Sequence, residues 1–69
     1  MLSNLDCSIL KELDRQNIKS DVISVVMNRL DTNDKKNDFL SFMIDNRNVL
    51  ISLKDIYNYL WSDKNERYL

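Results

Sequence analysis

The chain contains neither glycine nor proline in its 69 residues, and it contains no alanine. Two-residue β-hairpin turns strongly prefer glycine, and the loops that cradle phosphate groups need backbone conformations that only glycine adopts easily. This composition therefore disfavours a β-rich fold and the usual kinds of nucleotide-binding site. It also indicates an AT-rich gene from a low-GC bacterium, a phage, a plasmid or a large DNA virus, with chance in a short chain as the alternative.

The length of 69 residues predicts one small domain, residues 1–69, and its net charge is −1. A chain of this size buries only about 60% of its unfolded surface, so its stability is marginal. Cys7 is the only cysteine and cannot form an internal disulfide, and there is no histidine to bind a metal or act as a general base. We therefore expect self-association or a protein partner to add stability, and no cofactor.

Capping residues and apolar residues at helical spacing predict four helices. The expected segments are Ser3, as a cap, to about Gln16; 21–30 with Ser20 as its cap; 34–46; and Leu53 to about Trp61. Asparagine at positions 17 and 46 marks two of the ends, because this residue tolerates the left-handed conformation that stops helices. The predicted fold class is all-α, a compact bundle of four short helices with a helix–loop–helix in the C-terminal half.

Residues 39–61, FLSFMIDNRNVLISLKDIYNYLW, form the best-determined stretch of the chain. Ser52 and Asp55 have the spacing of a capping box, and Ile51 and Ile56 flank the cap at the spacing of a hydrophobic staple. The preceding residues 49–51 are apolar and are expected to form an extended connector. The stretch therefore predicts two helices joined by a short loop.

The segment 21–30, DVISVVMNRL, contains a run, ISVV, that would also suit a strand. It lacks strict alternation, and no pairing strand with turn signals lies nearby, so we favour a helix. Such a helix is apolar on most sides, which places it centrally in the domain or in contact with another chain.

Catalysis and metal binding have little support in the sequence. Asp31, Asp34 and Asp38 are close enough in sequence to bind a hard cation, but their spacing does not match a calcium loop and helix caps explain them better. Cys7 is expected to be a small buried hydrophobe beside the apolar face of the first helix. We therefore predict no enzyme activity and no catalytic, cofactor-binding or metal site.

The C-terminal third, LISLKDIYNYLWSDKNERYL, resembles the opening of a helix-turn-helix. Three apolar residues take the core positions of its first helix: Leu53, Ile56 and Leu60. The segment DFLSFMIDNRNVLISLKDIYNYLW is likewise similar to the front half of a winged-helix domain. The resemblance implies a small DNA-binding transcriptional regulator, but Trp61 or Ser62 replaces the usual glycine of the turn and no full recognition helix follows. Because there is no basic excess to neutralise phosphates, we keep DNA binding as the alternative function and do not expect a nucleic-acid partner.

Aromatic residues gather toward the end of the chain, and they cannot all face inward on a short helix. Tyrosine and tryptophan are enriched at interface hot spots because they bury a large area and keep a polar group. The alternative is that Trp61 closes the protein's own core. The predicted partner interface consists of Tyr57, Tyr59, Trp61, Tyr68 and Val26.

The favoured function is a small non-enzymatic protein–protein interaction module, regulatory or inhibitory, that occludes a surface of its partner and is encoded by a phage, virus or mobile element. A homodimer is expected because a bundle of this size can bury only one stripe of each helix. The N-terminal segment MLSNLDCSIL does not have the pattern of a signal peptide, and no apolar run is long enough to span a membrane. We therefore expect a cytoplasmic protein, in a bacterium or a host cell.

Overall fold

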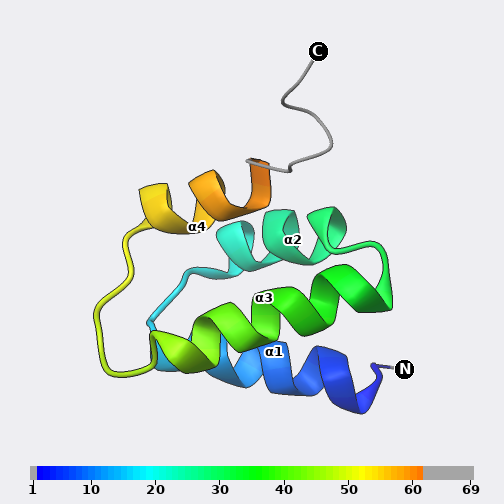
Figure 1. Cartoon of the computed structure of the whole chain (residues 1–69). Helices are drawn as coiled ribbons and strands as arrows, with labels where there is room; N and C mark the ends of the chain where they lie inside the picture. The colour runs from blue at the N-terminus through cyan, green and yellow to red at the C-terminus, as the bar shows by residue number, and fades with distance from the viewer. Residues whose placement is uncertain (1, 62–69) are drawn as a thin grey trace.

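Four helices form most of the computed structural model, which describes residues 2–61. Helix α1 spans Asn4–Arg15, α2 Ser20–Arg29, α3 Asn33–Asp45 and α4 Leu53–Trp61. Successive helices run in alternating directions, with α1 and α4 on opposite sides of the α2 and α3 pair (Figure 1). The predicted all-α bundle of four short helices is confirmed, and residues 2–61 contain no strand.

Side-chain caps fix the starts of three helices. Ser3 and Asp6 form a capping box on α1, because the Ser3 hydroxyl accepts from the Asp6 N–H at 3.1 Å and the Asp6 carboxylate accepts from the Ser3 N–H at 3.3 Å. Ser52 and Asp55 form the same reciprocal pair on α4, at 3.1 and 3.3 Å. The Thr32 hydroxyl caps α3 by accepting from the backbone of Lys35 at 3.2 Å.

Both predicted helix ends at asparagine are confirmed, although the two residues act differently. Asn17 follows α1 with a φ of 59°, the left-handed conformation that ends a helix without glycine. Asn46 caps α3 with a negative φ, and its side-chain amide donates to the carbonyl of Phe42 at 2.8 Å. Amide chemistry in the turns therefore replaces the missing glycine.

The predicted cap of α2 is wrong. Ser20 is already the first helical residue, and Lys19 occupies the capping position without a side-chain hydrogen bond. Instead, the Asp21 carboxylate accepts from the Val22 N–H at 2.9 Å within the first turn. A serine at the first helical position lies past the capping position, so its hydroxyl does not accept from the free N–H groups of the first turn as a capping side chain does.

The strand-like run in α2 is helical because its packing favours that conformation. Val22, Val26 and Leu30 recur every four residues, so a helix presents all three to the same side. Val26 and Leu30 are buried in the core and Val22 packs against it. Tertiary burial thus outweighs the preference of β-branched residues for strands.

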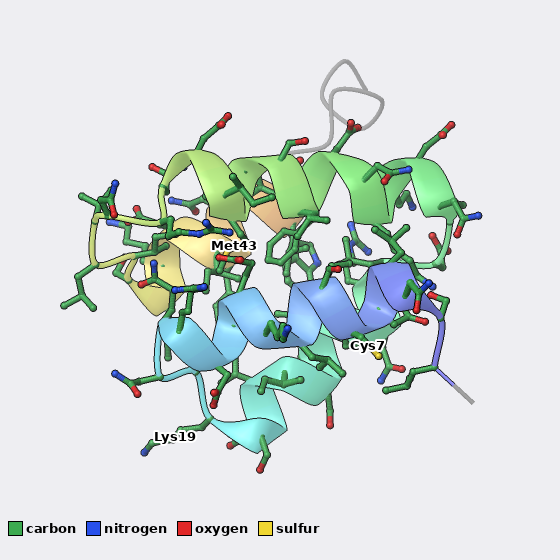
Figure 2. The ribbon with its side chains drawn as sticks, turned by 90° about the horizontal axis from the view of Figure 1, so that it is seen from below. Cys7, Lys19 and Met43 are labelled. Atoms are coloured by element: carbon green, nitrogen blue, oxygen red, sulfur yellow. The ribbon has the colours of Figure 1, made fainter. Side chains whose placement is uncertain are left out.

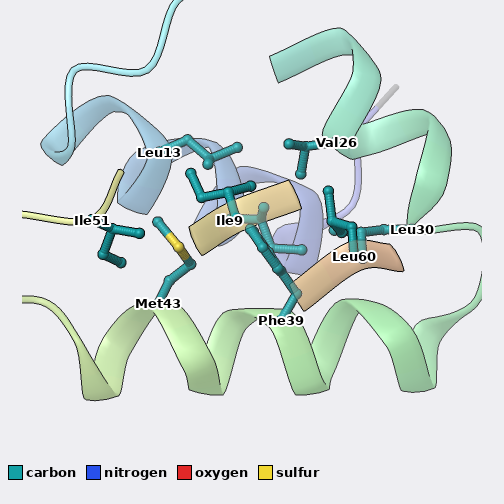
Figure 3. Packing of buried hydrophobic residues seen from close by; sticks show 9 residues of the cluster. Ile9, Leu13, Val26, Leu30, Phe39, Met43, Ile51 and Leu60 are labelled. Atoms are coloured by element: carbon teal, nitrogen blue, oxygen red, sulfur yellow. The ribbon is translucent and has the colours of Figure 1, made fainter. Parts of the chain in front are cut away.

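The hydrophobic core lies between the four helices, and every helix contributes to it (Figure 3). Phe39 and Met43 of α3 point inward between α1 and α4, where they are almost completely buried. The buried core residues are Ile9, Leu13, Val26, Leu30, Phe39, Met43, Ile51, Ile56 and Leu60. None of the helices in residues 2–61 is long and apolar enough to cross a membrane.

Cys7 does not lie beside the core, contrary to the prediction. It is exposed on the outer side of α1, whereas Ile9 is fully buried and Met43 points toward the interior (Figure 2). Cys7 and Ile9 are two positions apart, which is about 200° around an α-helix of roughly 3.6 residues per turn. The apolar side of α1 therefore faces away from the thiol.

One turn of α1 holds the loop between α3 and α4. The Glu12 carboxylate, which is buried, accepts two hydrogen bonds from the Arg47 guanidinium, from Nη2 at 2.6 Å and from Nε at 3.2 Å. One turn later, the Gln16 amide donates to the Val49 carbonyl at 2.9 Å, and its oxygen accepts from the Ile51 N–H at 3.0 Å. Buried polar groups are thus paired across more than thirty residues of sequence, as burial requires.

The Arg47 guanidinium lowers the pKa of the Glu12 carboxyl below its ordinary value of 4.5 through these hydrogen bonds, against the opposing effect of burial. A second ion pair ties α1 to α3, with Lys36 Nζ 2.9 Å from the Asp6 carboxylate. Hydrogen bonds from Lys36 and Ser3 lower the pKa of Asp6 in the same way. Both carboxylates therefore stabilise the folded state in their ionised form.

The first prediction concerns the cap of α4. Ser52→Ala should lower the free energy of unfolding by about 1 kcal/mol, because the Asp55 N–H loses its partner. The control is Ser20→Ala, which removes a serine that caps nothing and should change stability by less than about half of that amount. Urea unfolding followed by circular dichroism gives both values, and equal effects of the two substitutions would contradict the assignment of the cap.

The second prediction concerns Glu12 and pH. Because its folded pKa is lower than its unfolded pKa, the ion pair stabilises the protein fully above about pH 4.5, and this stabilisation is lost as pH falls through the folded pKa. Glu12→Gln should lower stability at pH 7 by about 1.5 kcal/mol, the low end for charged hydrogen bonds, since Arg47 is partly exposed.

Thermal unfolding between pH 7 and pH 3 measures this effect. The gap in stability between wild type and Glu12→Gln should close as the pH falls below 4.5. Asp14→Asn removes a carboxylate at an exposed position of the same helix and serves as the control, since a surface substitution of this kind should change stability at pH 7 by less than about 0.5 kcal/mol. A gap that stays constant across this range would show that the Glu12 charge does not stabilise the fold.

Candidate protein-interaction face

Side chains that are exposed or only partly buried, most of them apolar or aromatic, form a strip along α2 and α4 at the edge of the core. Leu53, Tyr57 and Trp61 recur every four residues on α4, so they share one side of that helix. On α2, Val22, Val25 and Arg29 are three and four residues apart, so they share one side of that helix. We call this strip the α2–α4 face, and it consists of Val22, Val25, Arg29, Leu53, Tyr57 and Trp61.

The two helices run in the same direction, so their first turns lie at one end of the pair and their last turns at the other (Figure 1). Val22 and Leu53 line the same cleft where the helices begin. Where the helices finish, Arg29 Nε donates to the carbonyl of Leu60 at 3.3 Å, and its guanidinium lies over the Trp61 ring. The strip is therefore joined across the boundary between α2 and α4 where the helices end, and a cleft separates its two sides where they begin.

Trp61 is held in place while nearly half of it remains exposed. The Arg29 guanidinium carbon lies 4.8 Å from the centre of the indole ring, and Tyr57 meets that ring edge-on at 5.6 Å and 78°. These two contacts are the favourable geometries for a cation over a ring and for a pair of rings. The side chain is 47% exposed. Trp61 is therefore an ordered aromatic group on the surface rather than a closure of the core.

Tyr59 belongs to the packing between α3 and α4. Its ring stacks on Phe42 at 4.5 Å and 21°, and it meets Phe39 edge-on at 5.7 Å and 60°. Burial, together with the nearby Asp38 carboxylate, raises the pKa of the Tyr59 phenol. Because its neighbours already cover much of the ring, Tyr59 offers a partner less surface than Trp61.

Val26 does not fit the predicted interface. Its side chain is 0% exposed and lies in the core with Leu30 and Leu60 (Figure 3). The helical pattern predicted burial at this position correctly, but it could not distinguish burial in the core from burial against another chain. Tyr68 lies outside the described residues. The structure thus brings Tyr57 and Trp61 together and separates them from Val26.

A cleft of about 340 Å³ opens at the other end of the α2–α4 face. Its walls come from three places: the α1–α2 turn, the first turn of α2, and the connector into α4. The apolar residues that line it include Ile18, Val22, Leu50, Ile51 and Leu53. Lys19 stands at this cleft and extends away from the helices (Figure 2). The volume falls near the lower end of the range of about 300–1,000 Å³ for ligand pockets.

Sequence reasoning missed the role of Leu50 and of the cleft. The connector was expected to be apolar and extended, and successive side chains in an extended segment point to opposite sides. The predicted staple already required Ile51 to face inward, where it is buried. That pair of inferences could have placed Leu50 outward. Leu53, expected as a core position of a helix-turn-helix, is likewise 44% exposed, whereas Ile56 and Leu60 are buried.

The chemistry of the described surface is that of packing and hydrogen bonding. Within residues 2–61 no group of three or more cysteine, aspartate, glutamate or histidine side chains could hold a metal ion. The charged side chains at the first turns of α2 and α4 are Lys19, Asp21, Lys54 and Asp55, all exposed. This face can therefore bind a largely apolar surface with a polar rim.

Comparisons of the chain with protein-family models, with curated proteins and with solved structures found no match. The functional interpretation of this face therefore rests on its own geometry.

Proposed function

We propose that this protein is a small non-enzymatic protein–protein interaction module whose binding surface is the α2–α4 face. One observation carries the proposal: Trp61 is fixed by Tyr57 and Arg29 yet remains 47% exposed. A side chain that is already held in place loses less conformational entropy when it binds. Tryptophan, tyrosine and arginine are also the residue types that dominate interface hot spots.

The apolar residues around Trp61 extend this surface. Val25 and Leu53 are 40% and 44% exposed, and they belong to the same strip as the two aromatic rings. Contiguous exposed apolar patches in small proteins usually mark binding sites, because leaving them in water is unfavourable. The proposed mechanism is occlusion, in which the α2–α4 face covers a functional surface of its partner. A regulatory or inhibitory protein of a phage, virus or mobile element would act in this way.

Self-association is the first form of binding that we propose. The marginal core of so short a chain gains stability when an apolar strip is buried against a second copy. Two-fold homodimers are the commonest assemblies of soluble proteins. The homodimer is therefore part of the proposal, and a foreign partner would compete for the same face.

DNA binding, the alternative, gains no support from the basic side chains. Among the residues that the structure describes, the basic side chains that lie within 4 Å of a carboxylate include Arg15, Lys35, Lys36 and Arg47. Phosphate contacts require basic groups that are gathered on one surface and available to the nucleic acid. These pairings reduce what the described residues could offer to a duplex.

The third prediction tests the proposed function. Sedimentation equilibrium at micromolar concentration should give about twice the chain mass of 8.2 kDa for the wild type. Trp61→Glu should weaken association by at least about 2 kcal/mol, the loss typical of a hot spot, and shift the mass toward that of one chain.

The matched control is Leu2→Glu, which places the same charge on an exposed apolar residue before α1, outside the α2–α4 face. It should leave the mass at the wild-type value. Helical circular dichroism spectra from all three proteins would exclude unfolding as the cause. A well-folded wild type that sediments as one chain up to high concentration would refute self-association.

A further inference from the structure

The most exposed large apolar side chain of the described residues is Leu50, which is 85% exposed. It projects from the connector between α3 and α4, between Val49, which is exposed, and Ile51, which is buried. A leucine in this position gains nothing from the core of its own chain. Its side chain is therefore available to a partner.

Gln16, the C-cap of α1, holds the peptide groups on both sides of Leu50. Its amide nitrogen donates to the Val49 carbonyl at 2.9 Å and, at 3.4 Å, to the carbonyl of Asn46. Its amide oxygen accepts from the Ile51 N–H at 3.0 Å. Gln16 is itself only 7% exposed. Leu50 is thus a projecting side chain on a fixed backbone, and such preorganisation reduces the entropy lost when it binds.

The cleft of about 340 Å³ lies directly beside this leucine, and Leu50 contributes to one of its walls. Ile18, Val22 and Leu53 supply further apolar lining. The protein therefore carries a projecting apolar side chain and an apolar depression next to each other on one surface.

We propose that Leu50 of one chain inserts into this cleft of a second copy, and that the second copy returns the same contact across a two-fold axis. The inference rests on the proposed self-association and names the residues at the centre of the contact. A two-fold interface requires a surface that is complementary to itself, with each element of the pair present on both chains. A projection beside a matching depression meets that requirement.

Charge supports a second copy as the occupant. The first turns of α2 and α4 carry Lys19, Asp21, Lys54 and Asp55, two groups of each sign. The two signs balance within these four groups, so two such surfaces brought together do not repel each other as two surfaces of one sign would. A surface selective for a strongly acidic or strongly basic partner would instead carry an excess of the opposite sign.

The experiment uses two single variants of the full chain and their mixture. Leu50→Asp puts a charge on the projecting side chain, and Val22→Lys puts the opposite charge in the cleft. Each variant alone should associate at least about thirtyfold more weakly than the wild type and sediment near 8.2 kDa. The equimolar mixture should recover about twice that mass, because one contact of the mixed dimer keeps Leu50 against Val22 and the other joins Asp at 50 to Lys at 22.

Val49→Asp is the matched control, since Val49 is exposed on the same connector but does not line the cleft. It should associate like the wild type. If circular dichroism shows that Val22→Lys is unfolded, Leu53→Lys places the same charge in the cleft from a more exposed position.

The outcomes separate this inference from the proposed function. If the wild type is a dimer and Leu50→Asp is a dimer too, the reciprocal contact is refuted. It is also refuted if both single variants are monomers and their mixture stays monomeric. Either result would leave self-association through another part of the α2–α4 face. A monomeric wild type would refute self-association and this inference together.

Discussion

The last turn of α1 and its C-cap hold the loop that leads from α3 into α4. Glu12 binds the Arg47 guanidinium, and Gln16 binds the backbone at Val49 and Ile51. Both side chains are buried, so losing a partner would leave a polar group without a hydrogen bond in the interior, at a cost of about 1–3 kcal/mol. No glycine or proline is available to shape this loop, and these long-range hydrogen bonds shape it instead.

The position of the loop has consequences on both of its sides. Inward, it places Ile51 in the core just before the Ser52 cap, which sets the starting point of α4. Outward, it leaves Leu50 projecting next to the cleft. With its start fixed, α4 lies beside α2 and brings Trp61 under the Arg29 guanidinium. The core and the proposed binding surface therefore depend on the same contacts.

The sequence predicted the features that depend on neighbouring residues. Caps such as Ser52 and Asp55, and the left-handed Asn17, follow from local chemistry, and the four helices follow from periodicity. The errors lie where distant contacts decide. Val26 is apolar and central in α2, but only the folded chain shows that its own core covers it completely.

Features of the α2–α4 face that depend on contacts between distant residues could not be predicted for the same reason. Glu12 and Gln16 are ordinary polar residues of an amphipathic helix until Arg47 and the loop backbone approach them from more than thirty residues away. The cleft and the exposure of Leu50 are results of that approach. The contact between Arg29 and Trp61 likewise joins the ends of two helices, and the spacing of apolar residues within each helix does not show which helices lie side by side.

Amide hydrogen exchange of Ile51, followed by NMR, tests the central contact most directly. The account predicts that this loop amide is protected in the wild type by Gln16, and that Gln16→Met, which keeps the side-chain length but removes every side-chain hydrogen bond of Gln16 to the loop, abolishes the protection. The Asp55 amide, held locally by Ser52, should keep its protection in both proteins and serves as the internal reference. An Ile51 amide that exchanges freely in the wild type, or equally slowly in both proteins, would contradict the account.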